Sequence, residues 1–245
     1  MRIDTICILG GTGFVGGHLV TRLVNEGYTV RVPTRHRERH RELLVIPQVQ
    51  LRQVPDFSVE TLAAQFSGCQ AVINLVGILN GSPEAFHRVH AQLPADVVEA
   101  AARAGTTRYL HMSALNADAE HGPSEYLKSK GAGEAAAHAG AERGLQVTSF
   151  RPSVIFGPDD GFFNRFATLL RLSLVLPLAC PNARFAPVYV GDVVEAFVRS
   201  LNDPDSFGQG YELCGPKSYT LRELVEYTGK LIGRRRLVIG LSDKL

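Results

Sequence analysis

The sequence predicts an α/β fold: a doubly wound parallel sheet with helices on both faces, followed by a small, discontinuous C-terminal lobe. Two observations predict this class. Up to about residue 150, short runs rich in Val, Ile and Leu alternate with amphipathic segments, which is the pattern of βαβ units. At residues 10–16 a glycine-rich turn, GGTGFVG, separates the first apolar run from the first amphipathic one.

The individual elements follow from this alternation. Strands are expected near residues 4–9, 28–33, 49–54, 70–76, 107–112 and 145–150. Helices are expected between them at about 14–26, 37–44, 58–67, 83–104 and 125–143. Strands that alternate with helices in this way predict a parallel sheet.

The pattern changes after Arg151, where RPSVIFGPDDG carries two prolines and two glycines. The apolar stretch 172–180 is expected to be buried, the alternative being a lid or a surface that meets a membrane or a partner. Strand and helix return over 185–201, where Asp192 is expected to cap the helix. Farther on, SYTLRELVEYTGKLIG predicts a helix with a capping box from Thr220 to Glu223. We therefore expect a first domain from residues 1–151 and 185–203, and a small lobe from 152–184 and 204–245.

Length, charge and cysteine usage exclude several classes of protein. The 26 Lys and Arg are balanced by 24 Asp and Glu, so we do not expect a nucleic-acid partner. The four cysteines have no CxxC spacing, which indicates reduced thiols and no metal site. The first expected strand begins almost at Met1, and no apolar run reaches about 18 residues. We expect a cytoplasmic protein.

The glycine turn is placed to bind a dinucleotide. Gly10 allows a sharp turn, Gly13 removes a side chain where a pyrophosphate approaches the backbone, and Gly16 allows close packing of helix and strand. The following helix offers unpaired N–H groups and a partial positive charge to the phosphates. The expected cofactor-binding residues of this turn are Gly10, Gly11, Thr12, Gly13, Phe14, Val15 and Gly16.

Tyr126, Lys130 and Ser113 form the candidate catalytic set. The four-residue spacing places Tyr126 and Lys130 on one helical face. An ammonium close to a phenol lowers the phenol pKa from about 10, which prepares the tyrosine for proton transfer. Ser113 follows the fifth expected strand, and its hydroxyl can orient a substrate oxygen. The same lysine is expected to contact the ribose of the cofactor.

The GxxGxxG spacing resembles the short-chain dehydrogenase/reductase superfamily, particularly its extended, epimerase/dehydratase-like branch. SALNADAEHGPSEYLKSK contains the catalytic interval of that superfamily, and RPSVIFGP with PVYVGDVVEA is similar to extended members. The segments HMSALNAD, YLKSKGAGE, RPSVIFGPDDGFFNRFA and YELCGPKSYTL resemble the atypical group that includes the nucleotide-binding accessory subunit of mitochondrial complex I and its bacterial relatives. The resemblance implies a Rossmann-type fold. It also implies that the second lobe is cut short, because members of the group continue beyond residues 234–245.

The resemblance also implies further site residues. Asn74, Leu75, Val76 and Gly77 are expected to contact the cofactor after the fourth strand, Asp56 to lie near the adenine, and Pro152, Ser153 and Val154 to lie near the nicotinamide. The superfamily usually adds an asparagine in the helix before the fifth strand. FHRVHAQLP contains none, and His87 and His90 stand near that place; a lone helical histidine is usually structural.

The end of the second strand predicts NADP(H) as the favoured cofactor, with NAD(H) as the alternative. An NAD site usually has an acid about 20 residues after the glycines. Here PTRHRERH offers Arg35, which can bind a 2′-phosphate, and has no acid before Glu38.

Two functions follow from these residues. One is an NAD(P)-dependent oxidoreductase or epimerase-type enzyme acting on a small-molecule substrate. The other, implied by the resemblance, is a cofactor-binding structural or assembly subunit without turnover. That subunit would be peripherally associated with a membrane-bound respiratory or quinone-synthesis complex, at the inner face of the membrane.

Overall fold

The computed structural model describes residues 2–241 and divides the chain into two units. The first unit comprises Met1–Pro152 and Val194–Glu212, and the second comprises Ser153–Val193 and Leu213–Leu245. Compared with the expected ranges, residues 204–212 join the first unit because a strand there adds to its sheet. Residues 185–193 join the second unit because their two short strands pair within it.

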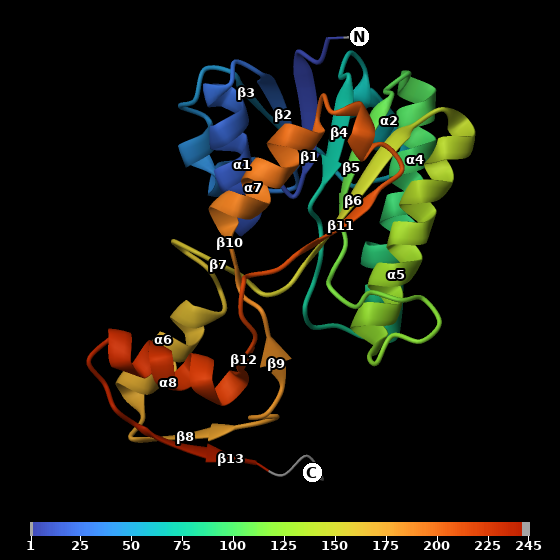
Figure 1. Cartoon of the computed structure of the whole chain (residues 1–245). Helices are drawn as coiled ribbons and strands as arrows, with labels where there is room; N and C mark the ends of the chain where they lie inside the picture. The colour runs from blue at the N-terminus through green and yellow to red at the C-terminus, as the bar shows by residue number, and fades with distance from the viewer. Residues whose placement is uncertain (1, 242–245) are drawn as a thin grey trace. The chain divides into compact units, whose positions relative to one another are not determined.

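The first unit is built on a seven-stranded parallel sheet of the Rossmann type with the order β11-β6-β5-β4-β1-β2-β3 (Figure 1). Its strands are β1 (Thr5–Leu9), β2 (Thr29–Thr34), β3 (Val49–Gln53), β4 (Ala71–Asn74), β5 (Arg108–Met112), β6 (Gln146–Pro152) and β11 (Gly210–Leu213). The chain order reverses between β1 and β4. Loops that follow the strands on either side of this point form the crevice where such sheets bind ligands.

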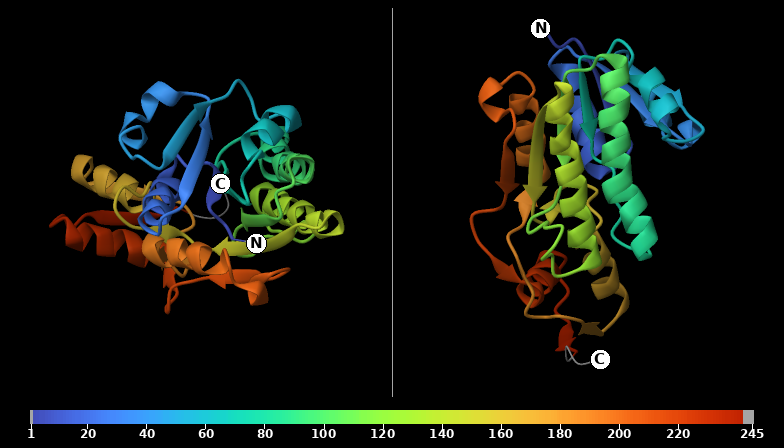
Figure 2. Two further views of the ribbon diagram at one scale, coloured as in Figure 1. Left: turned by 90° about the horizontal axis from the view of Figure 1, so that it is seen from above. Right: turned by 90° about the vertical axis from the view of Figure 1, so that its right-hand side faces the viewer.

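Helices cover both faces of this sheet (Figures 1 and 2). The helices of the first unit are α1 (Phe14–Asn25), α2 (Val59–Phe66), α3 (Pro83–Phe86), α4 (Leu93–Ala104) and α5 (Glu125–His138), and α7 (Val190–Ser200) runs into it from the second unit. On one face, α4 contacts both α2 and α5. On the other face, Arg22 of α1 pairs with Glu195 of α7 at 3.1 Å.

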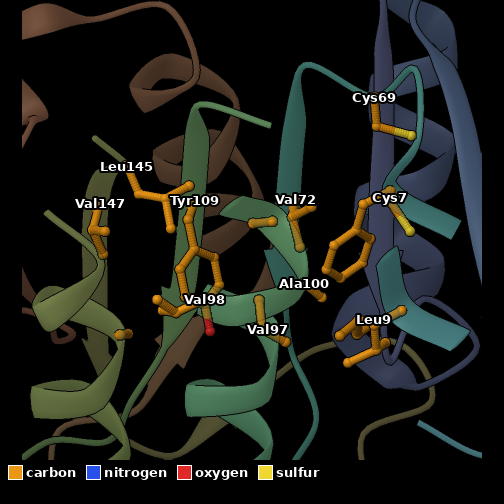
Figure 3. Close-up of a cluster of buried hydrophobic side chains, with 14 of the residues drawn as sticks. Cys7, Leu9, Cys69, Val72, Val97, Val98, Ala100, Tyr109, Leu145 and Val147 are labelled. Carbon is orange, nitrogen blue, oxygen red and sulfur yellow. The ribbon is translucent and has the colours of Figure 1, made fainter. Parts of the chain in front are cut away.

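One hydrophobic core lies between the sheet and the helices α2, α4 and α5 (Figure 3). Cys7 and Leu9 of β1, Val72 of β4 and Tyr109 of β5 supply the sheet side, and Val97 of α4 is among the helix residues. All five are buried. The central strands are buried along almost their whole length, as expected where helices cover both faces.

Two expected helices take a different form. Residues 37–44 form two short 3₁₀ turns, Arg37–Arg39 and Arg41–Leu43, because the segment lacks an apolar stripe that a helix could bury. The expected helix 83–104 is continuous, but its residues His87–Gln92 form a π-helical segment between α3 and α4.

In its described part, which ends at residue 241, the second unit contains three pairs of short strands and two helices. The helices are α6 (Phe163–Leu172) and α8 (Leu221–Leu231), and the strand pairs are β7 (Ile155–Phe156) with β10 (Val188–Tyr189), β8 (Val175–Leu178) with β13 (Leu237–Gly240), and β9 (Arg184–Phe185) with β12 (Tyr219–Thr220). A small core joins Leu170 of α6, Leu176 and Leu178 of β8, Val225 of α8 and Val238 of β13.

Three details of this part of the chain were expected from the sequence. The capping box at Thr220 and Glu223 is confirmed. Asp192 lies in the first turn of α7 rather than at its N-cap, because the helix begins at Val190. The stretch 172–180 contains both exposed and buried side chains: Leu176 is buried, whereas Leu172 is 82% exposed. The expectation that all of the stretch is buried is therefore wrong.

Candidate functional site

The glycine turn joins β1 to α1 and is shaped by the absence of side chains. Gly10 adopts φ 78°, and a Cβ on it would lie 3.1 Å from the carbonyl carbon of Leu75. A Cβ on Gly16 would overlap the carbonyl oxygen of Gly10, so helix and strand pack against bare backbone. Gly13 is the N-cap of α1 and carries no capping side chain, and the first turn of the helix has no acid. The first amides of α1 therefore present an uncompensated positive end, which fits a pyrophosphate. Gly11 and Thr12 complete the turn, and Phe14 and Val15 are the first two residues of α1.

The loop after β4 lies directly against this turn. Asn74 is buried, its Oδ1 accepts the N–H of Val76 at 3.0 Å, and its Nδ2 donates to the Tyr109 hydroxyl at 3.4 Å. These bonds use the Asn74 side chain to shape the loop. A Cβ on Gly77 would lie 3.9 Å from the Lys130 Nζ, so the loop reaches the candidate catalytic lysine. Residues 74–77, which include Leu75, thus lie between the glycine turn and α5, as the resemblance implies for a cofactor loop.

Arg35 and Asp56 lie beyond the ends of β2 and β3. Arg35 is exposed, and within residues 2–241 its guanidinium makes no hydrogen bond or ion pair. Asp56 Oδ1 accepts hydrogen bonds from the Ser58 amide at 3.0 Å and the Thr61 hydroxyl at 2.8 Å. These bonds lower the pKa of Asp56, the Ser58 amide having the largest effect. One oxygen of Asp56 is therefore committed to the start of α2.

Lys130 is brought to the end of β5. It is 4% exposed, and its Nζ donates to the carbonyl of Met112 at 2.6 Å. Burial lowers the pKa of Lys130 to about 8, against an opposing effect of Glu134. Ser113, the residue after Met112, is 3% exposed, and its Oγ makes no hydrogen bond of normal geometry among the described residues, although it is close enough to the Glu134 carboxylate to help lower the pKa of that group. A buried hydroxyl without a partner is rare, and it fits a site that accepts a ligand oxygen.

Tyr126 lies one turn before Lys130 on α5, which begins with Ser124 as its N-cap. The half-buried phenol ring meets the rings of His90 and Phe86 edge to face, at centroid distances of 5.3 and 6.1 Å. The expectation that Lys130 lowers the Tyr126 pKa is wrong in this structure. Burial raises the pKa of Tyr126, and the Lys130 ammonium is bound to the Met112 carbonyl.

His90 is the residue whose contacts the sequence did not reveal. Its Nε2 accepts the N–H of Ile78 at 3.0 Å, and its Nδ1 lies 2.9 Å from the Ser129 hydroxyl. A Cβ on Gly77 would lie 3.6 Å from the same Nε2. Burial, followed by the Lys130 charge, lowers the pKa of His90 to about 4. The missing asparagine of the superfamily was the signal that pointed to this position.

A second polar cluster lies farther along α5. Glu134 binds Arg151 through a 2.8 Å ion pair and accepts the Ser149 hydroxyl at 2.6 Å, while His138 Nε2 lies 3.0 Å from the same hydroxyl. Burial opposes ionisation of Glu134, but its interactions with Arg151, Ser149 and Ser113 outweigh burial and lower the pKa. Glu134, His138 and Arg151 line a hollow of about 660 Å³ in the first unit. The other lining residues are Ala117–His121, Gly131, Ala135, Gly208 and Gly210.

The segment after β6 crosses from the first unit to the second. Pro152 is the last residue of β6, and its carbonyl accepts the N–H of Leu115 at 3.0 Å. Ser153 and Val154 belong to the second unit, where the Ser153 Oγ accepts the Ala186 N–H at 3.2 Å. The expected roles of these two residues near the nicotinamide stay predictions.

Within residues 2–241, no group of three or more His, Cys, Asp and Glu side chains is placed to bind a metal ion. No helix in the same range has the length and apolar character needed to cross a bilayer.

Two relatives show what the chain is similar to. It is 31% identical over 227 residues to NADH dehydrogenase (ubiquinone) 1 alpha subcomplex subunit 9 of Mus musculus, which covers 90% of this chain and 59% of that protein. It is 30% identical over 242 residues to the ceramide reductase of Caulobacter vibrioides, which covers 97% of this chain and 74% of that protein. The chain spans 56–64% of the length of the first three complex I relatives.

The fold is shared with solved structures of low sequence identity. The dTDP-glucose 4,6-dehydratase DesIV of Streptomyces venezuelae, solved with NAD, superposes with a TM-score of 0.86 at 22% identity, covering 98% of this chain and 85% of that one. The UDP-glucose 4-epimerase of Thermus thermophilus, also with NAD, gives a TM-score of 0.79 at 22% identity, covering 96% and 85%. The model of the NAD dependent epimerase/dehydratase family matches residues 6–214. The chain therefore belongs to this family, the extended branch of the short-chain dehydrogenases/reductases.

Proposed function

We propose that this chain binds NADP(H) and reduces a carbonyl compound, with Tyr126 as the proton donor. The observation that supports this best is the presence of two buried polar groups at the end of β5: the Lys130 ammonium, which is bound to the Met112 carbonyl, and the Ser113 hydroxyl, which makes no hydrogen bond of normal geometry within the described residues. Leaving a hydroxyl buried without a partner costs about 1–3 kcal/mol. A substrate oxygen that accepts a hydrogen bond from Ser113 would remove this cost. A protein that only holds a cofactor offers no such partner.

Each residue has a separate role in the proposed reaction. The bound nicotinamide supplies the hydride. Ser113 donates a hydrogen bond to the carbonyl oxygen, and Tyr126 transfers its phenolic proton to the same oxygen as it gains charge. Lys130, whose Nζ is held at the Met112 carbonyl, binds the ribose of the cofactor. The uncapped first turn of α1 binds the pyrophosphate.

The protonated state of Tyr126 is the one that carbonyl reduction uses. An epimerase or dehydratase cycle starts by oxidising an alcohol, which requires the phenolate as base. Burial raises the pKa of Tyr126, so at neutral pH the residue holds its proton. A protonated phenol is the acid that carbonyl reduction needs.

An apolar carbonyl compound is the substrate class that we favour. The second unit carries a cluster of aromatic rings, in which Phe162 contacts Phe163, Phe166 and Phe185 at centroid distances of 5.1–5.9 Å. A nucleotide-sugar diphosphate would call for paired cations instead. The similarity to a protein named ceramide reductase supports the same choice.

A second candidate function rests on the complex I relatives. Proteins named as subunits of that complex in mouse and Arabidopsis thaliana are 31% and 33% identical to this chain. In this alternative the chain holds NADP(H) without turnover, as a peripheral subunit of a membrane-bound respiratory or quinone-synthesis complex. The intact set of Ser113, Tyr126 and Lys130 favours the enzyme.

Replacement of the phenol oxygen separates the two functions. We expect Tyr126→Phe to lower turnover of NADPH with a ketone or quinone by about 10²–10⁴-fold, because it removes the acid and keeps the ring. The dissociation constant for NADPH should change less than about threefold, whereas Lys130→Met should weaken NADPH binding as well. Absence of turnover by the parent across a broad screen of carbonyl compounds, with NADPH bound, would favour the subunit.

A further inference from the structure

The π-helical segment places His90 between the cofactor loop and the catalytic helix. His90 is 1% exposed and lies in the middle of His87–Gln92. Its backbone carbonyl rests on Gly133 of α5, where a Cβ would overlap the carbonyl oxygen. Single turns of π-helix are rare and often occur at functional sites. Here the extra residue in the turn and the bare glycine bring the ring against α5.

The hydrogen bonds of the ring determine its tautomer. Ile78 donates its N–H to Nε2, so Nε2 carries no proton. Ser129 uses its one hydroxyl proton to donate to the Tyr126 carbonyl at 2.8 Å. The Ser129 oxygen must therefore accept from Nδ1–H, across 2.9 Å. Only the Nδ1–H tautomer of His90 allows all three hydrogen bonds of this network to form.

We propose that His90, held as the Nδ1–H tautomer, is a positioning residue that fixes the cofactor loop at Ile78 and the proton-donor helix at Ser129 and Tyr126 relative to each other. This inference rests on the proposed function of Tyr126 and deepens it. Phe86 stacks on one side of the imidazole at 5.5 Å, and the Tyr126 ring packs edge to face against it at 5.3 Å. The imidazole thus sets the position of the phenol through packing, and the position of Gly77 and Ile78 through a hydrogen bond.

An imidazole can form hydrogen bonds with both Ile78 and Ser129, whereas an asparagine cannot. The amide of asparagine reaches only as far as the Nδ1 position, so it can bond Ser129 but not Ile78. A glutamine reaches farther, so its Oε1 can replace Nε2 at Ile78 but leaves Ser129 without a donor. The two substitutions therefore separate the two ends of the connection.

The first test uses readouts that do not depend on turnover. In ¹⁵N-labelled protein, the His90 imidazole should show a protonated Nδ1 and an unprotonated Nε2 at neutral pH. Hydrogen exchange of the Ile78 amide should accelerate about tenfold in His90→Asn, because one hydrogen bond is lost, and less than about threefold in His90→Gln. His87→Gln, an exposed change in the same π-helical segment, is the control and should alter neither. The opposite tautomer, or unchanged Ile78 exchange in His90→Asn, would overturn the inference.

The second test measures how the two hydrogen bonds of His90, to Ile78 and to Ser129, affect NADPH binding and turnover. His90→Asn should weaken NADPH binding about tenfold by releasing the loop, while His90→Gln binds NADPH nearly as the parent does. Ser129→Ala should leave NADPH affinity unchanged and lower kcat, because it disturbs only the helix end. Equal losses of NADPH affinity in the asparagine and glutamine variants would contradict the proposal. A parent without turnover would refute the enzyme but leave the tautomer and the Ile78 result to decide this inference.

Discussion

At the scale of single residues, Arg35 is the residue on which the predicted preference for NADPH rests. It lies just beyond β2, is exposed and makes no hydrogen bond or ion pair within residues 2–241. We expect the protein to bind NADPH at least tenfold more tightly than NADH, because the guanidinium can bind the 2′-phosphate through two hydrogen bonds. Arg35→Asp should reverse the preference, as measured by titration with both nucleotides. Arg37→Asp is the matched control, and equal affinities in the parent would disprove the assignment.

His90 also makes the stability of the fold depend on pH. Its pKa is lowered from the ordinary 6.5 to about 4, so between these values the unfolded chain binds the proton more strongly than the folded one. The contribution of His90 to the free energy of unfolding is complete above pH 6.5. About 3 kcal/mol of it is lost as the pH falls towards 4. The groups facing the imidazole are Lys130 and Tyr126 of α5 and His111 of β5, and burial also lowers the His111 pKa.

The measurement is urea unfolding at pH 7 and pH 5. We expect the difference in unfolding free energy between these pH values to shrink in His90→Gln and to stay as in the parent in His87→Gln. The parent's remaining dependence comes from His111 and His138, whose pKa values burial also lowers. An unchanged difference in His90→Gln would show that its imidazole does not titrate as described.

These residues mark the limit of what the sequence can predict. Spacing placed Tyr126 and Lys130 on one helical face, and the Met112 contact of Lys130 agrees with that location. The Tyr126 pKa was predicted in the wrong direction, because burial of the phenol depends on Phe86 and His90. Those rings come from a segment 36–40 residues earlier in the chain, and no local pattern reports their approach.

At the scale of the elements, different glycines of the turn between β1 and α1 serve packing and cofactor binding. A Cβ at Gly16 would overlap backbone, one at Gly13 would lie 3.3 Å from the Gly10 carbonyl oxygen, and one at Gly17 would have no atom within 4 Å. We expect Gly16→Ala to lower the midpoint of thermal unfolding, and Gly17→Ala to raise stability by about 0.5–1 kcal/mol through helix propensity. Gly13→Ala should keep the fold and weaken NADPH binding.

Thermal unfolding and NADPH titration of the three variants check this order. Equal NADPH affinity in the Gly13 and Gly17 variants would mean that the turn does not approach a pyrophosphate.

The elements that the sequence predicted well have a local cause. The capping box at Thr220 and Glu223 and the strand-turn-helix at 5–25 depend on residues within one or two turns of each other. The segment 37–44 was predicted to be helical from the alternation of strand and helix segments, yet it has no apolar face to bury and forms 3₁₀ turns. The π-helical segment His87–Gln92 depends on Gly133 of another helix, so its own sequence could not predict it.

At the scale of the whole molecule, the two units differ in the size of their cores. Among the described residues, the second unit buries a cluster of five side chains, whereas one cluster of the first unit alone contains fifteen. Smaller cores stabilise less, so we expect the amides of α6 and α8 to exchange faster than those of α4 and α5. Hydrogen-exchange mass spectrometry of the parent measures this. Equal protection of the two groups of helices would show that the units unfold as one.

The return of the chain to the first unit governs the order in which the protein can be completed during synthesis. Strand β11 adds to β6 only after residues 153–209 have been made, and at about 5–20 residues per second this takes several seconds. The hydrogen bonds of Arg108 in β5 are also completed late. Its buried guanidinium donates to the carbonyls of Ser200 and Leu201 and to the Ser206 hydroxyl, which emerge from the ribosome more than 90 residues later. Until then the nascent sheet exposes the edge of β6 and an incompletely bonded cation, so this interval is when the new chain is most open to pairing with another.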